Sequence, residues 1–170
     1  MRVAYHAETG RVRFIGSRPG SEFAQSLSQA NAREAVAAAM AFLDVYGSLF
    51  GLRNPGYELA LLRTRVQTFG GVSVRLQQRH AGVPVLGAEL IVQLGARGAV
   101  TSAGGEILPD LSLSTTPRVD AAVARDSALA QTAHRYGLAP DRLSASAPEL
   151  YIFGRALLGG EGSREPRLVW

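Results

Sequence analysis

Hydrophobic and polar residues alternate over two neighbouring stretches in the middle of the chain. In residues 72–77, VSVRLQ, every second residue is apolar, which predicts a strand with one buried face. The pattern breaks at residues 80–82 and resumes in the apolar stretch 85–94. Pro84 cannot donate a ladder hydrogen bond, so we expect it at the mouth of a hairpin or on a sheet edge. The two stretches therefore predict a β-hairpin.

The flanking residues predict further strands and one long helix. Alternation over 59–66 and 99–103, with turns between, extends the hairpin into an antiparallel meander, and residues 11–15 predict another short strand. Asn31 and Glu34 stand at capping-box positions of a helix that Gly51 can end. This helix carries one apolar stripe, made of Ala32, Val36, Ala39, Leu43, Tyr46 and Phe50. A helix laid across such a sheet predicts a cystatin-like α+β fold.

The C-terminal part predicts a second unit of the same kind. Residues 104–117 are loop-like, and we place a boundary near Thr116, which divides the chain into modules 1–115 and 116–170. Asp120 can cap a helix that runs to Tyr136 and ends at Gly137, and strands are expected over 149–153 and 167–170. We therefore expect two cystatin-like modules, each a helix packed on an antiparallel sheet. The last strand is expected to be cut by the C-terminus.

Composition is typical of a soluble, core-forming protein, with 46% hydrophobic residues in a chain of 170. Cysteine is absent, which excludes disulfide bonds and thiolate zinc sites. No apolar stretch approaches the roughly 20 residues that span a bilayer, so we expect no membrane insertion. The first residues contain no apolar region of the kind found in a signal peptide.

The basic residues number 18, all of them arginine, and they are spread along a chain of net charge +4. Nucleic-acid binding needs a clustered basic face and a reader motif, so we expect no nucleic acid as partner. Arginines of two predicted strands are expected to share one sheet face: Arg63, Arg65, Arg75 and Arg79. Such a face could bind carboxylates of a partner by bidentate hydrogen bonds, or it could simply be solvated.

The sequence contains no recognisable catalytic constellation. A zinc peptidase site of the H-E-x-x-H type places two histidines on one helical turn, and His6, His80 and His134 fit no such spacing. No G-x-S-x-G motif, P-loop or paired acid and base stands out. We therefore expect no catalytic residues, no metal ligands and no cofactor in this chain.

Residues 75–89 have the sequence R-x-Q-Q-x-x-x-G-V-P-V-x-G-A-E, and this motif resembles a known family signature. It is similar to the fungalysin/thermolysin-propeptide module in the pro-regions of secreted thermolysin-type zinc metallopeptidases. The matching residues are Arg75, Gln77, Gln78, Gly82, Val83, Pro84, Val85, Gly87, Ala88 and Glu89. We expect the two glycines to meet backbone demands of turns and the two glutamines to satisfy neighbouring backbone groups. Residues 116–170 more loosely resemble the PepSY module of the same pro-regions.

The resemblance implies a non-catalytic pro-region, which acts as intramolecular chaperone and inhibitor of a catalytic domain outside this chain. Zinc is then expected only in that domain, the parent is a zinc metalloendopeptidase, and the protein is secreted or extracellular. The alternative is a free-standing cystatin-like binding or protease-inhibitory module at the cell surface. An H-E-x-x-H motif in the same reading frame distinguishes the two.

Overall fold

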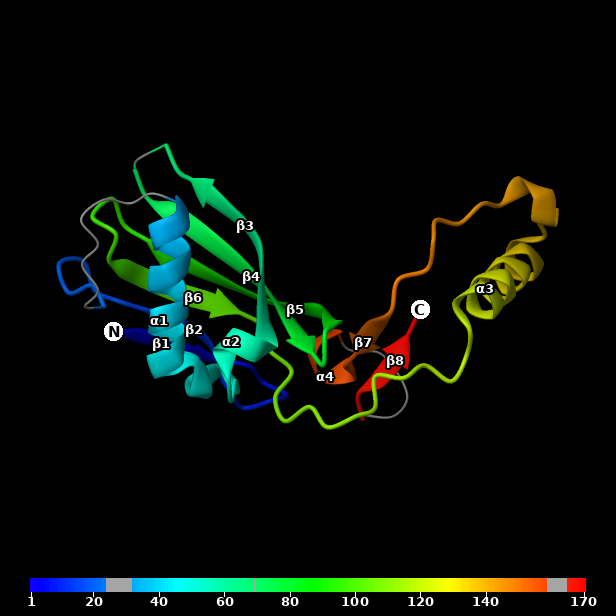
Figure 1. Ribbon diagram of the computed structural model, residues 1–170, viewed down its shortest axis with the longest axis horizontal. Helices are drawn as coiled ribbons and strands as arrows, with labels where there is room; N and C mark the ends of the chain where they lie inside the picture. Colours follow the sequence, from blue (N-terminus) through cyan, green and yellow to red (C-terminus); the bar gives the residue numbers. More distant parts are fainter. Residues whose placement is uncertain (24–31, 69, 159–164) are drawn as a thin grey trace.

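The computed structural model describes residues 1–23, 32–68, 70–158 and 165–170 (Figure 1). Its largest feature is a mostly antiparallel sheet with strand order β1-β2-β6-β5-β4-β3. These strands are β1 (Arg2–Tyr5), β2 (Val12–Gly16), β3 (Leu59–Val66), β4 (Val72–His80), β5 (Val83–Leu94) and β6 (Val100–Gly105). The predicted meander and the strand near residues 11–15 are thus confirmed. The mixed helix and sheet content confirms the α+β class.

Helix α1 (Ala32–Phe50) lies across one face of this sheet (Figure 1). Ala39, Leu43 and Phe50 of the predicted stripe are buried in the main hydrophobic cluster, and Val36 and Tyr46 pack against it. Gly51 ends the helix with a positive φ of 96°. The expected cap at Asn31 lies outside the described residues. A short helix, α2 (Pro55–Glu58), then leads into β3.

Strands β4 and β5 form the predicted hairpin, joined by a two-residue turn. His80 pairs with Val83, and the turn residues Ala81 and Gly82 have φ values of 47° and 84°. Two successive positive φ angles match the right-handed twist of the flanking strands, as in a type I′ turn. Pro84 is the second residue of β5 and lies at the hairpin mouth, as expected.

Strand β5 joins two hydrophobic clusters. Beyond a positive φ at Gly87, its C-terminal half contributes to the main cluster under α1. Its N-terminal half contributes Val85 and Ala88 to a smaller cluster with Leu108 and Ile152. There β5 pairs in parallel with β7 (Tyr151–Phe153), which pairs antiparallel with β8 (Arg167–Val169), and α4 (Arg155–Leu158) lies beside them.

The second helix-on-sheet module is not confirmed. Helix α3 (Ala121–Tyr136) has the predicted caps: the Asp120 side chain accepts from the amide of Ala122, and Gly137 is left-handed. However, the only other described element that α3 contacts is the 3₁₀ helix η1 (Pro140–Arg142), and α3 projects away from the sheet in Figure 1. One residue of α3, Ala133, is buried, so nearly all of the helix surface is left exposed.

Candidate partner-binding site

The adjacent glutamines of the signature are the buried polar residues of the described fold. Gln77 donates from its Nε2 to the carbonyl oxygens of Val85 and Ala88, at 2.7 and 2.8 Å. These two carbonyls flank the bend at Gly87, where strand β5 leaves regular pairing. The amide thus bonds to backbone groups in the part of β5 that β4 does not pair. This contact confirms the expected role of Gln77 toward neighbouring backbone.

Gln78 forms hydrogen bonds with the segment that follows β6. Its Nε2 donates to the carbonyl of Leu108 at 2.8 Å, and its Oε1 accepts from the amide of Leu108 at 2.9 Å. The side chain therefore pairs with residue 108 as another strand would. Because Leu108 belongs to the smaller hydrophobic cluster, Gln78 connects the hairpin to that cluster. The expectation for Gln78 is confirmed as well.

Two charged residues of the signature neutralise each other. Arg75 forms an ion pair with Glu89 on the neighbouring strand, and both side chains are partly exposed. Arg75 is therefore more than the solvated strand residue that alternation predicts. Sequence reasoning missed this partner, although the antiparallel pairing of 72–77 with 85–94 brings residue 89 close to residue 75.

Three of the four predicted arginines line one surface hollow of about 400 Å³. Arg63 stands directly opposite Arg75 in the β3–β4 ladder, and Arg65 stands opposite Ser73. The hollow is lined by these arginines together with polar residues such as Gln67, Thr68 and Gln93, and by no carboxylate of the described residues. We call Arg63, Arg65 and Arg75 the arginine surface. It lies on the sheet face opposite to the buried residues of β4.

Arg79 does not line that hollow. The β4–β5 register shifts between Gln77 and Arg79, and three successive buried residues, Leu76 to Gln78, interrupt the alternation that would have aligned Arg79 with Arg75. Arg79 instead lines a smaller hollow with Arg53, Glu58 and Asp110. The expected set of four arginines is thus a set of three.

The smaller hollow contains an acidic residue with a shifted pKa. Asp110 accepts hydrogen bonds from Arg53 at 2.7 Å and from Arg11 at 3.4 Å. The hydrogen bond from Arg53, and then the charges of Arg53 and Arg11, lower the pKa of this carboxyl below its usual range. The sequence offers no local signal for this cluster, because its members come from three distant segments.

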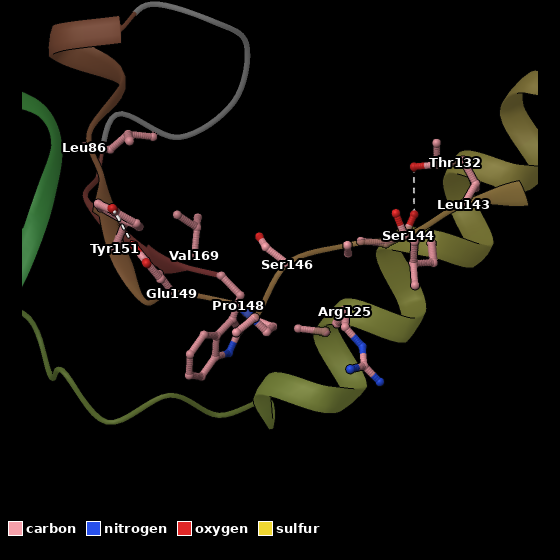
Figure 2. A pocket seen from close by; sticks show the side chains of 16 residues that line it. Leu86, Arg125, Thr132, Leu143, Ser144, Ser146, Pro148, Glu149, Tyr151 and Val169 are labelled. Atoms are coloured by element: carbon pink, nitrogen blue, oxygen red, sulfur yellow. Dashed lines mark hydrogen bonds between the residues drawn. The ribbon is translucent and has the colours of Figure 1, made fainter.

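An open groove of about 830 Å³ separates α3 from the strands β7 and β8. Figure 2 shows Arg125 and Thr132 of α3 on one side and Tyr151 and Val169 on the other. The hydroxyl of Tyr151 donates to Glu149 at 2.9 Å, which raises the pKa of Tyr151 above its usual value. The indole of Trp170 donates to the carbonyl of Val119 and ties the last strand to the segment before α3.

The histidines lie on separate elements. His6 accepts backbone hydrogen bonds in the turn after β1, His80 contacts the carbonyl of Leu113, and His134 is exposed on α3. In the described ranges no group of three or more potential metal-ligating side chains comes together. Across the same ranges, no helix has the length and apolar character to cross a membrane.

Residues 57–107 match the family described as Fungalysin/Thermolysin Propeptide Motif. The matched segment contains β3, β4, β5 and β6, and with them both glutamines and the arginine surface. A comparison with curated proteins found no match. The motif supports a propeptide region. The match ends before residues 116–170, so the PepSY-like module there stays a prediction.

Proposed function

We propose that this chain is the pro-region of a secreted thermolysin-type zinc metallopeptidase, and that it assists folding of the catalytic domain and then inhibits it. The observation that supports this most directly is the motif match over residues 57–107. Within it, the glutamines and glycines of the signature build the hairpin and its bend. The signature residues therefore determine the backbone conformation of the β4–β5 hairpin, which belongs to the part of the chain that would contact a partner.

The proposed activity needs no catalytic group in this chain. A pro-region that binds the folded catalytic domain and not its unfolded chain stabilises the folded form by mass action. The same binding blocks access to the cleft for as long as the pro-region stays bound. Zinc would be held by the catalytic domain, and residues 116–170 would form the PepSY-like module beside the motif.

The test begins with the natural coding sequence, which should place a domain with an H-E-x-x-H motif in the same precursor. That catalytic domain is then unfolded and diluted from denaturant with and without the purified chain. We expect the chain to raise the yield of active enzyme and to slow the mature enzyme in a saturable way.

Gln78→Leu gives a variant with a damaged fold that should lose both effects. A matched control is Gln131→Leu, since Gln131 is exposed on α3 and lines neither the hollow of the arginine surface nor the groove beside α3. A precursor without a peptidase domain would instead support a free-standing cystatin-like binding module. A peptidase domain on which the chain has neither effect would refute the chaperone and inhibitor roles.

A further inference from the structure

Strand β3 forms one end of the sheet and has an open edge. It is eight residues long, contains no proline, and pairs only with β4 among the described residues. The backbone amides and carbonyls along its outer side are thus available to an added strand. Long edges of this kind are the sites at which extended peptides join a sheet.

The two faces of β3 differ in chemistry. Leu61 and Val66 stand opposite the buried Leu76 and Val72, yet their own side chains are 50% and 64% exposed. The other face presents Arg63 and Arg65. An added strand would therefore meet an apolar face on one side and a cationic face on the other, with a period of two residues.

The cationic face carries charge that the described fold does not neutralise. Glu89 pairs with Arg75, but no carboxylate in the described ranges pairs with Arg63 or Arg65. Arg63 also stands directly opposite Arg75, and like charges so placed repel. A carboxylate brought to this face would relieve the repulsion.

We propose that β3 takes up an extended partner strand in which acidic residues alternate with apolar ones. Its backbone would continue the ladder, its carboxylates would meet Arg63 and Arg65, and its apolar side chains would cover Leu61 and Val66. The source of that strand, the peptidase domain, rests on the proposed function; the strand addition itself does not. A second copy of β3 is a poor occupant, because antiparallel self-pairing would bring arginines opposite arginines.

The experiment uses the purified chain and synthetic peptides as long as β3. The first peptide alternates glutamate with valine, the second alternates lysine with valine, and the third is the glutamate peptide with backbone N-methylation on one edge. We expect only the first to bind, with new hydrogen-exchange protection at amides of residues 59–66. N-methylation removes the ladder donors and keeps the charge, so it separates strand addition from simple charge attraction.

Two charge-reversed variants test the role of the arginines. Arg63→Glu with Arg65→Glu should weaken binding of the glutamate peptide by at least about tenfold, from two lost charge contacts. The control is Arg118→Glu with Arg142→Glu, which changes net charge equally at exposed arginines near α3 and should bind normally.

Equal binding of the methylated peptide, or no binding of the glutamate peptide, would overturn the proposal. Protection of β3 that rises with protein concentration in the absence of peptide would identify a second copy as the occupant and would also overturn it. A chain that captures the glutamate peptide but neither refolds nor inhibits the peptidase would refute the proposed function alone.

Discussion

At the scale of single residues, the signature is explained by two buried amides on successive positions of one strand. In a regular strand, neighbouring side chains point to opposite faces, so one of two adjacent residues is usually exposed. Gln77 and Gln78 are both buried; Gln77 bonds to the backbone at the bend of β5, and Gln78 bonds to the backbone of Leu108 after β6. A side-chain amide has both donors and an acceptor, so glutamine can pair with irregular backbone where an apolar residue cannot.

Replacing Gln78 by leucine should therefore destabilise the fold. The change leaves the amide and carbonyl of Leu108 without the partner they have now, and a buried polar group left unpaired costs about 1–3 kcal/mol. Gln67→Leu, at an exposed position, should stay within about 0.5 kcal/mol of the parent. Urea denaturation of the two variants measures both values. Equal midpoints would show that water or a local shift replaces the Gln78 contacts.

The hairpin turn allows a second test at this scale, at Gly82. Its φ of 84° lies in the left-handed region, and no atom lies within 4 Å of the position that a Cβ would occupy there. Gly82→Ala should thus cost about 1–2 kcal/mol from backbone conformation alone, without a steric clash. Gly56→Ala is the control, because that glycine lies in α2 without a positive φ, and a Cβ there would make only ordinary contacts. A lower melting temperature for Gly56→Ala than for Gly82→Ala would contradict the turn geometry.

At the scale of elements, local patterns predicted helices and strands well and their long-range partners poorly. The bounds of the helix 121–136 could be predicted from Asp120 and Gly137, because helix caps depend on residues next to each other in the sequence. The strand Arg2–Tyr5 was missed because all four of its residues are exposed and give no alternation. The parallel pairing of Val85 with Ile152 was missed because it joins residues far apart in the chain. The displacement of Arg79 was missed because alternation assumes a regular strand.

Helix α3 should behave as a unit largely independent of the sheet, since of the described elements it contacts only η1. Asp120→Ala removes its N-cap, which typically costs about 0.5–2 kcal/mol of helix stability. We expect faster amide exchange in residues 121–136 and an unchanged denaturation midpoint for the sheet. Asp126→Ala is the control, because Asp126 lies inside the helix, where its side chain bonds to Arg125 and caps nothing. A lower midpoint for the whole protein in Asp120→Ala would show that α3 is coupled to the sheet.

At the scale of the whole molecule, two hydrophobic clusters of unequal size share strand β5. The larger one lies between α1 and the sheet, and the smaller one gathers residues of 108–113, residues of 152–157 and Leu168 around Val85. Strand β7 thus joins the sheet of the matched motif through β5, and β8 pairs with β7. Stability in such a structure is uneven, because a region with few buried apolar residues can open while the larger core stays folded.

The unequal clusters predict different effects for two equivalent truncations of fully buried side chains. Ile152→Ala and Leu90→Ala each create a cavity that typically costs about 2–5 kcal/mol. In the smaller cluster, Ile152→Ala should release β7, α4 and β8 from β5, with loss of amide protection there and normal protection in β4 and β6. In the larger cluster, Leu90→Ala should lower protection throughout the sheet, since β5 is its central strand beside β4 and β6. Hydrogen exchange resolved by residue distinguishes the two patterns. Uniform loss of protection in both variants would mean that the clusters unfold as one cooperative unit, and the C-terminal segment would then be as integral to the fold as the motif itself.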